Sequence, residues 1–584
     1  MSKSLSPIIN FIWTVADDVL VHAYKKGKYG DVILPMTVIR RLDLVLEPSK
    51  DKVLKSYNSY KDRLDNLDYI LCSEKDGSGK QFYNTSRFTL KSLLDDPKNI
   101  RTNFENYLDG FSANVQDIIA KFDFRNQLNK LENNADDIHL LFSLIEKFVS
   151  PKIDLHPDHL SNHDMGYVFE DLVRRFNEEN NEEAGEHFTP REIIELMTNI
   201  VFLPIKEKLQ HGTYLVYDPC SGSGGMLTEA RSYINNTIGS DALVHLYGQE
   251  IQPETYATCK ADFLIKGDDP DKIAFGSTLT KDGFPDLKFD FMLTNPPYGK
   301  SWKDDKAKLG VGPKGAILDP RFQIGVSRVS DGQLMFLQHM ISKMKDTTLG
   351  SRIASVHNGS ALFTGDAGQG ESEIRRYIFE HDLLECIIAL PTDMFYNTGI
   401  PTYIFLLSNR KTEERKGKVI LINATSDKYY HLMRKNLGEK RVELLQEHVK
   451  KIVDIFVDFE HHPDAKIFDN DDFGYRQITV HQPQRDKDGR IITDKSGTPK
   501  IDTALKDSEN IPLKESVEEY FEREVKPYAP DAWFNPAETK IGYEISFNKY
   551  FYKYQPPRSL TEISRDLEKL EEESGVLLEE IIEL

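Results

Sequence analysis

The stretch YLVYDPCSGSGGMLTEA, from Tyr214 to Ala230, has the pattern of a strand, a glycine-rich loop and the start of a helix. An apolar run ends at Asp218-Pro219, and glycines follow at positions 222, 224 and 225. Glycine lets the backbone turn sharply and approach a ligand closely, and the first helical turn presents free N–H groups. The loop has neither the dinucleotide fingerprint nor the Gly-Lys-Ser/Thr ending of a P-loop. A cofactor loop and a purely structural turn are both compatible with this pattern.

A second acidic residue favours the cofactor loop. The next apolar stretch, LVHLYGQEI, carries Glu250 at its end, 32 residues after Asp218. A carboxylate at the end of that strand can accept hydrogen bonds from the two hydroxyls of a ribose. We therefore expect a nucleoside-like ligand that lacks a pyrophosphate.

Short apolar stretches alternate with helical ones between about residues 166 and 430. The apolar stretches are TYLVYDP, LVHLYGQE, FDFMLTNPP, SRIASVHN, LLECIIALP and TYIFLLSN. Such alternation predicts an α/β fold with a doubly wound, mostly parallel sheet. Ligands bind to these sheets where the carboxyl ends of the strands meet the loops.

The rest of the chain divides into two further regions. Residues 1–165 have apolar residues three and four apart, which predicts a helical domain that packs against the core or a partner. Within the C-terminal region, 431–584, the polar stretch 481–512 predicts a linker or surface excursion. Residues 558–584 carry a heptad seam, which predicts a helix that either folds back or docks on another subunit. The seam consists of Leu560, Ile563, Leu567, Leu570, Leu577, Ile581 and Leu584.

Composition limits the classes of partner. The 584 residues include 74 Lys and Arg against 94 Asp and Glu, a net charge of −20, so any contact with nucleic acid needs a local basic patch. Residues 299–328 provide one, with seven basic and three acidic residues, although a solvated mobile loop has the same composition. The four cysteines have no metal or disulfide spacing, so we expect reduced thiols and no metal site. Without an apolar run that could span a bilayer, a cytoplasmic protein is expected.

The segment GEHFTPREIIELM, Gly185 to Met197, precedes the glycine loop. Its Thr189, Pro190 and Glu192 predict a helix whose N-cap, first and third positions form a capping box. Phe188, just before this cap, is placed to lie flat against a cofactor. A well-capped helix with no further role explains the pattern equally well.

The stretch FDFMLTNPPYGKSW, Phe289 to Trp302, ends an apolar run in a rigid corner. Such a corner suits one particular target, the exocyclic amino group of a nucleobase. The nitrogen of this group is a poor nucleophile, and two acceptors that bind its two hydrogens can redirect its lone pair. The Asn295 side-chain carbonyl and the Pro296 backbone carbonyl provide such acceptors, and adjacent prolines fix the backbone around them. Tyr298 offers a flat face for stacking.

The order GEHFTP, DPCSGSGG and NPPY resembles that of N6-adenine DNA methyltransferases of the gamma arrangement, which use S-adenosylmethionine. More closely, the chain resembles the modification subunit of type I restriction–modification systems. This resemblance rests also on YGDVILPMTVIRRLD, LPTDMFYNTGIPTYIFLL and GYEISFNKYFY, and it covers nearly the whole chain. It implies a Rossmann-like class I methyltransferase core over 166–430 and site-specific methylation of adenine N6 in DNA.

The resemblance also assigns roles to individual residues. The residues implied to border the cofactor are Glu186, His187, Phe188, Thr189, Pro190 and Arg191; Asp218, Ser223, Gly224 and Gly225 would contact its methionine part, and Glu250 its ribose. Those implied to hold a flipped adenine are Asn295, Pro296, Pro297 and Tyr298, with Phe395 as a second stacking aromatic or a core residue. Contacts with the DNA backbone fall to Lys300, Lys303, Lys306 and Lys308. One departure is Ser277, where the family often has Asp or Asn near the cofactor's adenine amino group; we expect binding to be retained.

Partners are implied by what the chain lacks. No DNA-reading module is recognisable, so the resemblance implies double-stranded DNA read by a separate specificity subunit, flanked by two copies of this chain. An ATP-dependent restriction subunit can join such a complex, whereas this chain has no Walker motif and is not expected to cut or translocate DNA. Two rival functions are methylation of protein glutamine amides and an inactive scaffold, for which Ser277 is the sole hint.

Overall fold

The computed structural model describes residues 5–21, 23–132, 140–180, 189–209, 212–238, 242–310, 317–396, 398–552 and 559–582. The chain forms a large compact unit that ends at Ile545 and a small unit that begins at Ser546. Among the described residues, no helix combines the length and the apolar character needed to span a membrane.

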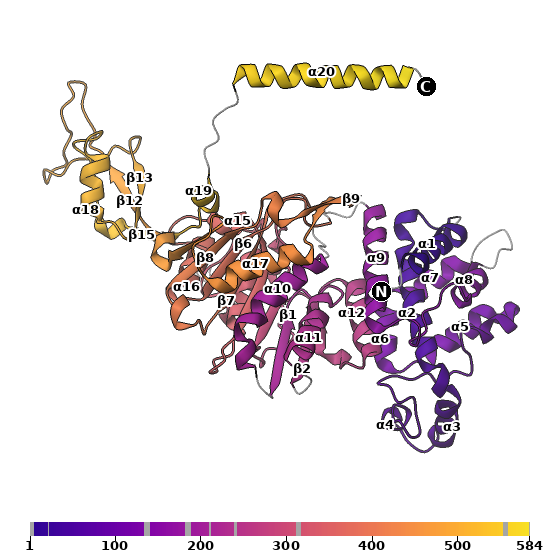
Figure 1. The fold of residues 1–584 in the computed structure, drawn as a ribbon. Coiled ribbons are helices and arrows are strands. Elements are labelled where there is room, and N and C mark those ends of the chain that lie inside the picture. Colours follow the sequence, from indigo (N-terminus) through magenta and orange to yellow (C-terminus); the bar gives the residue numbers. More distant parts are fainter. Residues whose placement is uncertain are drawn as a thin grey trace. The chain divides into compact units, whose positions relative to one another are not determined.

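A nine-stranded sheet is the centre of the large unit (Figure 1), with the order β11-β8-β6-β7-β5-β4-β1-β2-β3. Strand β7 pairs antiparallel with β5 and β6, and β11 pairs antiparallel with β8. All other neighbouring strands of this sheet are parallel. The strands are β1 (Thr213–Asp218), β2 (Leu243–Glu250), β3 (Ile273–Phe275), β4 (Phe291–Thr294), β5 (Arg352–Asn358), β6 (Leu384–Ala389), β7 (Thr402–Ser408), β8 (Lys418–Asn423) and β11 (Ala465–Asp469). The predicted doubly wound, mostly parallel sheet is confirmed.

Helices cover both faces of this sheet, which explains why its central strands are apolar on both sides. On one face, Val216 and Leu293 share an apolar core with α10, α11 and α17, and α10 and α17 lie side by side (Figure 1). On the other face, the Tyr217 hydroxyl contacts His339 of α14. These helices are α10 (Arg191–Phe202), α11 (Gly225–Ile238), α14 (Gln333–Ser342), α15 (Ser360–Phe363), α16 (Gly370–Glu380) and α17 (Gln446–Asp458).

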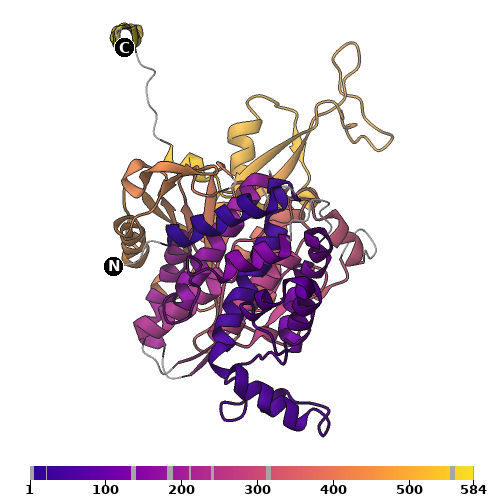
Figure 2. The same ribbon diagram turned by 90° about the vertical axis from the view of Figure 1, so that its right-hand side faces the viewer.

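The N-terminal region is helical, as predicted, and Figure 2 shows its indigo and purple helices gathered together. They are α1 (Ser6–Leu20), α2 (Gly30–Leu46), α3 (Lys50–Tyr60), α4 (Asp68–Leu71), α5 (Ile100–Asp109), α6 (Ala113–Lys121), α7 (Phe124–Glu132), α8 (Leu140–Val149) and α9 (Asn162–Asn180). Their core extends onto Ala257 and Ala261 of α12 (Pro253–Lys266), a helix that also packs on β2 and β3. The predicted boundary at residue 165 falls inside α9, so the two regions share one continuous helix.

The sequence after the core adds two small β elements. A hairpin is formed by β9 (His431–Leu437) and β10 (Lys440–Glu443), while β12 (Gly474–His481) pairs with β13 (Asp507–Pro512), β14 (Trp533–Phe534) and β15 (Lys540–Tyr543). The short helix α18 (Val517–Tyr520) follows β13. Of the stretch predicted as a linker or excursion, residues 507–512 therefore form a paired strand, and 482–506 connect the two strands.

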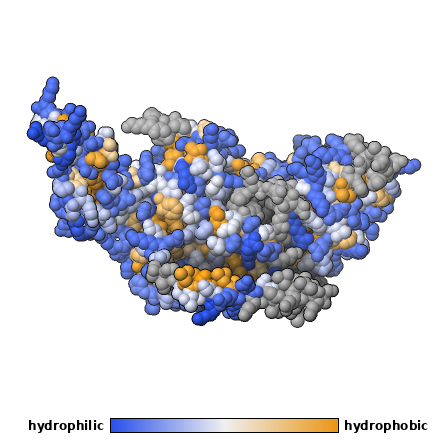
Figure 3. Space-filling model, turned by 90° about the horizontal axis from the view of Figure 1, so that it is seen from above, coloured by the Kyte–Doolittle hydropathy of each residue, from blue (hydrophilic) through white to orange (hydrophobic). Residues whose placement is uncertain are grey.

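The small unit contains α19 (Phe547–Phe551) and α20 (Leu560–Ile582). Residues 560–582 of the predicted heptad stretch thus form a helix, and three of its leucines are exposed: 83% for Leu560, 61% for Leu567 and 60% for Leu570. Most of the face seen in Figure 3 is hydrophilic, with apolar residues in small patches, as suits a chain with 29% charged residues.

Candidate active site

A cavity of about 320 Å³ lies at the carboxyl ends of β1, β2, β3 and β4. This is the edge at which the sequence predicted ligand binding. The predicted site residues that line it are Thr189, Asp218, Ser223, Gly225, Glu250, Asn295, Pro297 and Lys300. Residues as far apart in the sequence as Thr189 and Lys300 therefore meet at one opening.

The glycine loop has the backbone geometry that only glycine adopts readily. Gly222 and Gly224 have φ angles of 53° and 88°, in the left-handed region. A Cβ atom at Gly224 would lie 3.0 Å from the Sγ atom of Cys259 on α12. The helix α11 begins directly after this turn, at Gly225, so the turn brings the start of the helix to the cavity wall.

Glu250 is fixed by backbone N–H groups. The amide of Gly222 donates to its Oε2 atom over 2.9 Å, and the amides of Ile251 and Gln252 donate to Oε1, each over 2.8 Å. Because the carboxylate spans the glycine loop and the end of β2, it lies on the cavity wall in a single orientation. A carboxylate can accept about four hydrogen bonds, so its chemistry suits the hydroxyl groups of a ligand.

Asp218 connects the glycine loop to the NPPY corner. Its Oδ1 atom accepts hydrogen bonds from the Thr294 hydroxyl, over 2.7 Å, and from the Cys220 amide, over 2.9 Å. Burial raises the pKa of the Asp218 carboxyl to about 7, although both hydrogen bonds oppose the rise, and the charge of Glu250 adds to it. Thr294 immediately precedes Asn295, so this contact fixes the NPPY corner relative to the glycine loop.

The NPPY corner presents its residues unequally. Asn295 and Pro297 line the cavity, whereas Tyr298 is 3% exposed and belongs to the same apolar core as Phe395, which is 1% exposed. Burial raises the pKa of the Tyr298 hydroxyl. Both predicted stacking aromatics thus lie in one core rather than on the open wall, and the alternative of a core phenylalanine at 395 stays open.

The predicted capping box at Thr189 is wrong. The helix α10 begins at Arg191, with Pro190 at the N-cap and no side-chain capping bond. The Glu192 carboxylate binds Lys440 instead, because this lysine side chain is 3% exposed and needs a counter-charge. Arg191 lines a second, adjacent cavity of about 200 Å³, and the predicted Glu186, His187 and Phe188 lie outside the described residues.

Lys440 also connects α10 to the segment that carries Phe395. Its Nζ atom donates to the carbonyl of Met394 over 3.2 Å, and the amide of Arg441 donates to the carbonyl of Asp393 over 2.9 Å. The β9–β10 hairpin thereby fixes the backbone at Asp393 and Met394. No local sequence pattern indicates this role of Lys440, because it lies 248 positions from Glu192 in a polar stretch.

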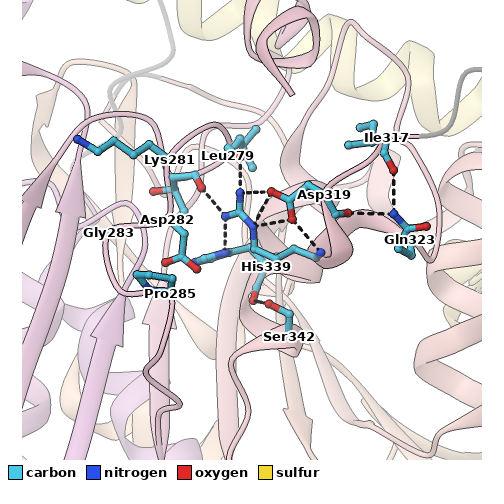
Figure 4. Close-up of polar contacts among 12 residues, drawn as sticks. Leu279, Lys281, Asp282, Gly283, Pro285, Ile317, Asp319, Gln323, His339 and Ser342 are labelled. Atoms are coloured by element: carbon cyan, nitrogen blue, oxygen red, sulfur yellow. Dashed lines mark hydrogen bonds and ion pairs between the residues drawn. The ribbon is translucent and has the colours of Figure 1, made fainter. Parts of the chain in front are cut away.

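A second cluster that the sequence did not reveal holds the loop after β3, which lines the cavity (Figure 4). The Arg321 guanidinium donates to the carbonyls of Thr278 and Leu279, over 2.8 and 2.7 Å, and pairs with Asp319. It also donates to His339 Nδ1 over 3.0 Å, and burial together with this charge lowers the pKa of His339 to about 3. Arg321, one of the basic residues of the predicted DNA-facing patch, is therefore an internal brace.

Two models of known protein families match this chain. The family model N-6 DNA Methylase matches residues 160–475, and the model HsdM N-terminal domain matches residues 8–148.

The chain belongs to the N-6 DNA methylase family. Its first match covers more than half of the sequence. The type I restriction enzyme HindI methylase subunit of Haemophilus influenzae is 32% identical over 296 residues, 50% of this chain and 61% of that protein. The MjaIX methylase subunit of Methanocaldococcus jannaschii is 29% identical over 330 residues, 56% of this chain and 54% of that protein. The chain thus spans about half to three fifths of these relatives.

A solved methyltransferase subunit of a type I restriction-modification system, from Streptococcus thermophilus, has the same fold. The TM-score is 0.59 at 20% identity, over 80% of this chain and 96% of that chain. The predicted methyltransferase core and the resemblance to type I modification subunits are confirmed. Membership of this family implies S-adenosylmethionine as the cofactor.

Proposed function

We propose that this chain is a site-specific adenine-N6 DNA methyltransferase, the modification subunit of a type I restriction–modification complex. The observation that carries the proposal is that Glu250, which suits a ribose, and Asn295, which suits a base amino group, line one cavity. The hydrogen bond between Thr294 and Asp218 supports it further, because it couples the two halves of the site.

The cofactor half of the cavity fits S-adenosylmethionine. Glu250 would accept hydrogen bonds from the ribose hydroxyls, and Asp218, Ser223 and Gly225 would border the methionine part. Gly222 has nothing within 4 Å of the position of a Cβ, so the loop leaves space on its ligand side. When bound, S-adenosylmethionine supplies an electrophilic methyl group.

The base half would hold an adenine that has turned out of the duplex. The Asn295 side-chain carbonyl and the Pro296 backbone carbonyl would accept hydrogen bonds from the N6 amino group and direct its lone pair. No strong base is required, because the amino proton can leave after the nitrogen has formed its new bond. Stacking on Tyr298 and Phe395 requires that an incoming base separates these two residues from their shared core.

Contacts with DNA fall to the corner that follows NPPY. Lys300, Lys303 and Lys308 are exposed, and Lys306 is half-buried, with its Nζ atom 5.8 Å from the centre of the Trp302 ring. On a chain with a net charge of −20, we expect these four lysines to bind a duplex only weakly without a further DNA-binding subunit. We propose that a specificity subunit reads the DNA and binds two copies of this chain through α20, whose Leu560, Leu567 and Leu570 are exposed. An ATP-dependent restriction subunit can join this complex.

The rival functions are less well supported. Methylation of glutamine amides poses the same nitrogen chemistry, but the match to N-6 DNA methylases over 160–475 favours adenine. An inactive scaffold need not bind the cofactor, so a binding measurement distinguishes it.

The first test is the Asn295→Ala variant, expressed with its genomic neighbours. We expect methylation of adenines in host DNA to disappear, while affinity for S-adenosylmethionine changes less than about threefold, because Asn295 contacts the base. Asn236→Ala, at an exposed position of α11, is the matched control and should retain methylation. Equal loss of methylation and cofactor binding would assign Asn295 a structural role.

A further inference from the structure

The end of the cavity that is formed by residues 276–279, after β3, lies on the side of Glu250 away from the glycine loop. Because β1, β2 and β3 are neighbours, the glycine loop, Glu250 and the loop after β3 follow one another along the carboxyl edge. If the cofactor lies as proposed above, its adenine extends toward residues 276–279, so the inference rests on the proposed function. Trp302 and Leu279 share a small apolar core there and line the cavity, as a wall for a flat ring requires.

Two polar side chains at this end are already engaged by the backbone. The Gln249 amide donates to the carbonyls of Gly276 and Lys281, over 3.1 and 2.7 Å, and accepts from the amide of Gly283 over 3.0 Å. The Thr278 hydroxyl donates to the carbonyl of Pro219 over 2.5 Å. Neither side chain has its main hydrogen-bonding groups available for a ligand.

Ser277 and Asp305 form a pair on the same wall. The Ser277 hydroxyl donates to Asp305 Oδ1 over 2.9 Å, and both residues line the cavity. Among the residues that the structure describes, this is the one side-chain hydrogen bond of Asp305. The carboxylate is thereby oriented by one contact and keeps further acceptor positions.

We propose that Asp305 accepts a hydrogen bond from the exocyclic amino group of the cofactor's adenine, and that Ser277 positions it. The enzymes that the sequence resembles often have Asp or Asn at the position of Ser277. Here the side chain at 277 is shorter, and the acid comes from α13 (Lys303–Lys308), on the other side of the NPPY corner. A carboxylate attracts an amino donor and repels a carbonyl oxygen, so it would select adenine over hypoxanthine.

The helix that carries Asp305 is anchored at its start. The Trp302 amide donates to the carbonyl of Val329 over 3.0 Å, and its indole N–H donates to the carbonyl of Arg328 over 2.9 Å. A Cβ atom at Gly332 would lie 3.0 Å from the Trp302 ring, so the ring packs directly on backbone. Since α13 also carries the lysines proposed to meet phosphates, Asp305 connects the adenine end of the cavity to these lysines.

The test measures ligand affinity of the full chain by calorimetry. The ligands are S-adenosylhomocysteine and its analogue with unsubstituted purine, which lacks the amino group. We expect Asp305→Ala to weaken binding of the first about 10- to 100-fold and of the analogue less than about twofold. Ser277→Ala should weaken the first ligand about two- to fivefold. Asp304→Ala, in the same helical turn but not on the cavity wall, should change neither.

Two results would overturn the inference. If Asp305→Ala weakened both ligands equally, the carboxylate would support the wall rather than read the amino group. If Asp304→Ala matched Asp305→Ala, the effect would come from the charge or stability of α13. A wild-type chain that bound neither ligand would overturn the proposed function itself, so the wild-type measurement separates the two failures.

Discussion

The two edges of the central sheet use acidic residues in opposite ways. At the amino edge, Glu385 of β6 is buried between Arg352 and Arg415, with N···O distances of 2.9 and 3.2 Å. At the carboxyl edge, Asp218 and Glu250 are also largely buried, but the hydrogen bonds that hold them come from N–H and hydroxyl groups. A buried carboxylate that is paired with cations has a structural role. A carboxylate that is held by neutral donors beside a cavity is placed to bind a ligand.

Of the substitutions proposed for the two edges, Glu385→Gln, at the amino edge, should cause the largest loss in the free energy of unfolding. It removes the charge between two buried guanidinium groups, and an uncompensated buried charge costs about 3–5 kcal/mol in unfolding free energy. Urea denaturation of the full chain measures this loss. Glu250→Gln is the matched change at the carboxyl edge. We expect it to cost about 1 kcal/mol in stability and to weaken S-adenosylhomocysteine binding about tenfold or more. Similar stability losses for both variants would contradict the contrast between the edges.

Asp218 sharpens the comparison through its pH dependence. Its pKa is raised from 3.8 to about 7 in the folded chain, so the folded state holds a proton that the unfolded state has lost between these values. Stability contributed by this group is therefore present at low pH and is lost as pH rises to about 7. Relative to Asp218→Asn, the wild-type chain without cofactor should lose about 1–3 kcal/mol between pH 5 and pH 8. A difference that grew with pH would show that the folded pKa is lowered instead.

Local sequence patterns predicted the parts of the site that lie where strands end. The apolar runs before Asp218, Glu250 and Asn295 each predict a strand, and the carboxyl ends of parallel strands meet at one edge, so these residues could be brought together from sequence. Glycine supplied the other signal, because few residues adopt the left-handed geometry of Gly222 and Gly224.

The missed parts depend on contacts between distant segments. Arg321 lies in a stretch with the composition of a surface loop. Its hydrogen bonds to residues 278, 279 and 339 nevertheless make it an internal structural residue that holds these segments together. The capping box failed because a remote lysine competes for Glu192. Asp305 looked like one acid among lysines until its contact with Ser277 placed it on the cavity wall. None of these contacts leaves a periodicity or a motif in the sequence.

Lys440 is an intermediate case between the two edges of the sheet. It forms a buried ion pair with Glu192, like those of Glu385, but this pair lies next to the candidate site. Its side chain is 3% exposed, and burial lowers its pKa while the charge of Glu192 opposes the change. Lys440→Met should cost about 1–2 kcal/mol in stability, since Glu192 keeps some access to water. Release of the carbonyl of Met394 should also lower kcat about three- to tenfold, with little change in KM for S-adenosylmethionine.

The control for that variant is Lys450→Met, which removes an exposed ion pair with Asp454 on α17. Exposed pairs contribute little, so both stability and kcat should stay close to wild type. The informative outcome is the split between the two kinetic constants of Lys440→Met. A loss of stability with kcat unchanged would place this lysine with Glu385, as a structural cation. A fall in kcat would mean that the buried ion pair of Lys440 also supports catalysis, because the lysine fixes the backbone next to Phe395.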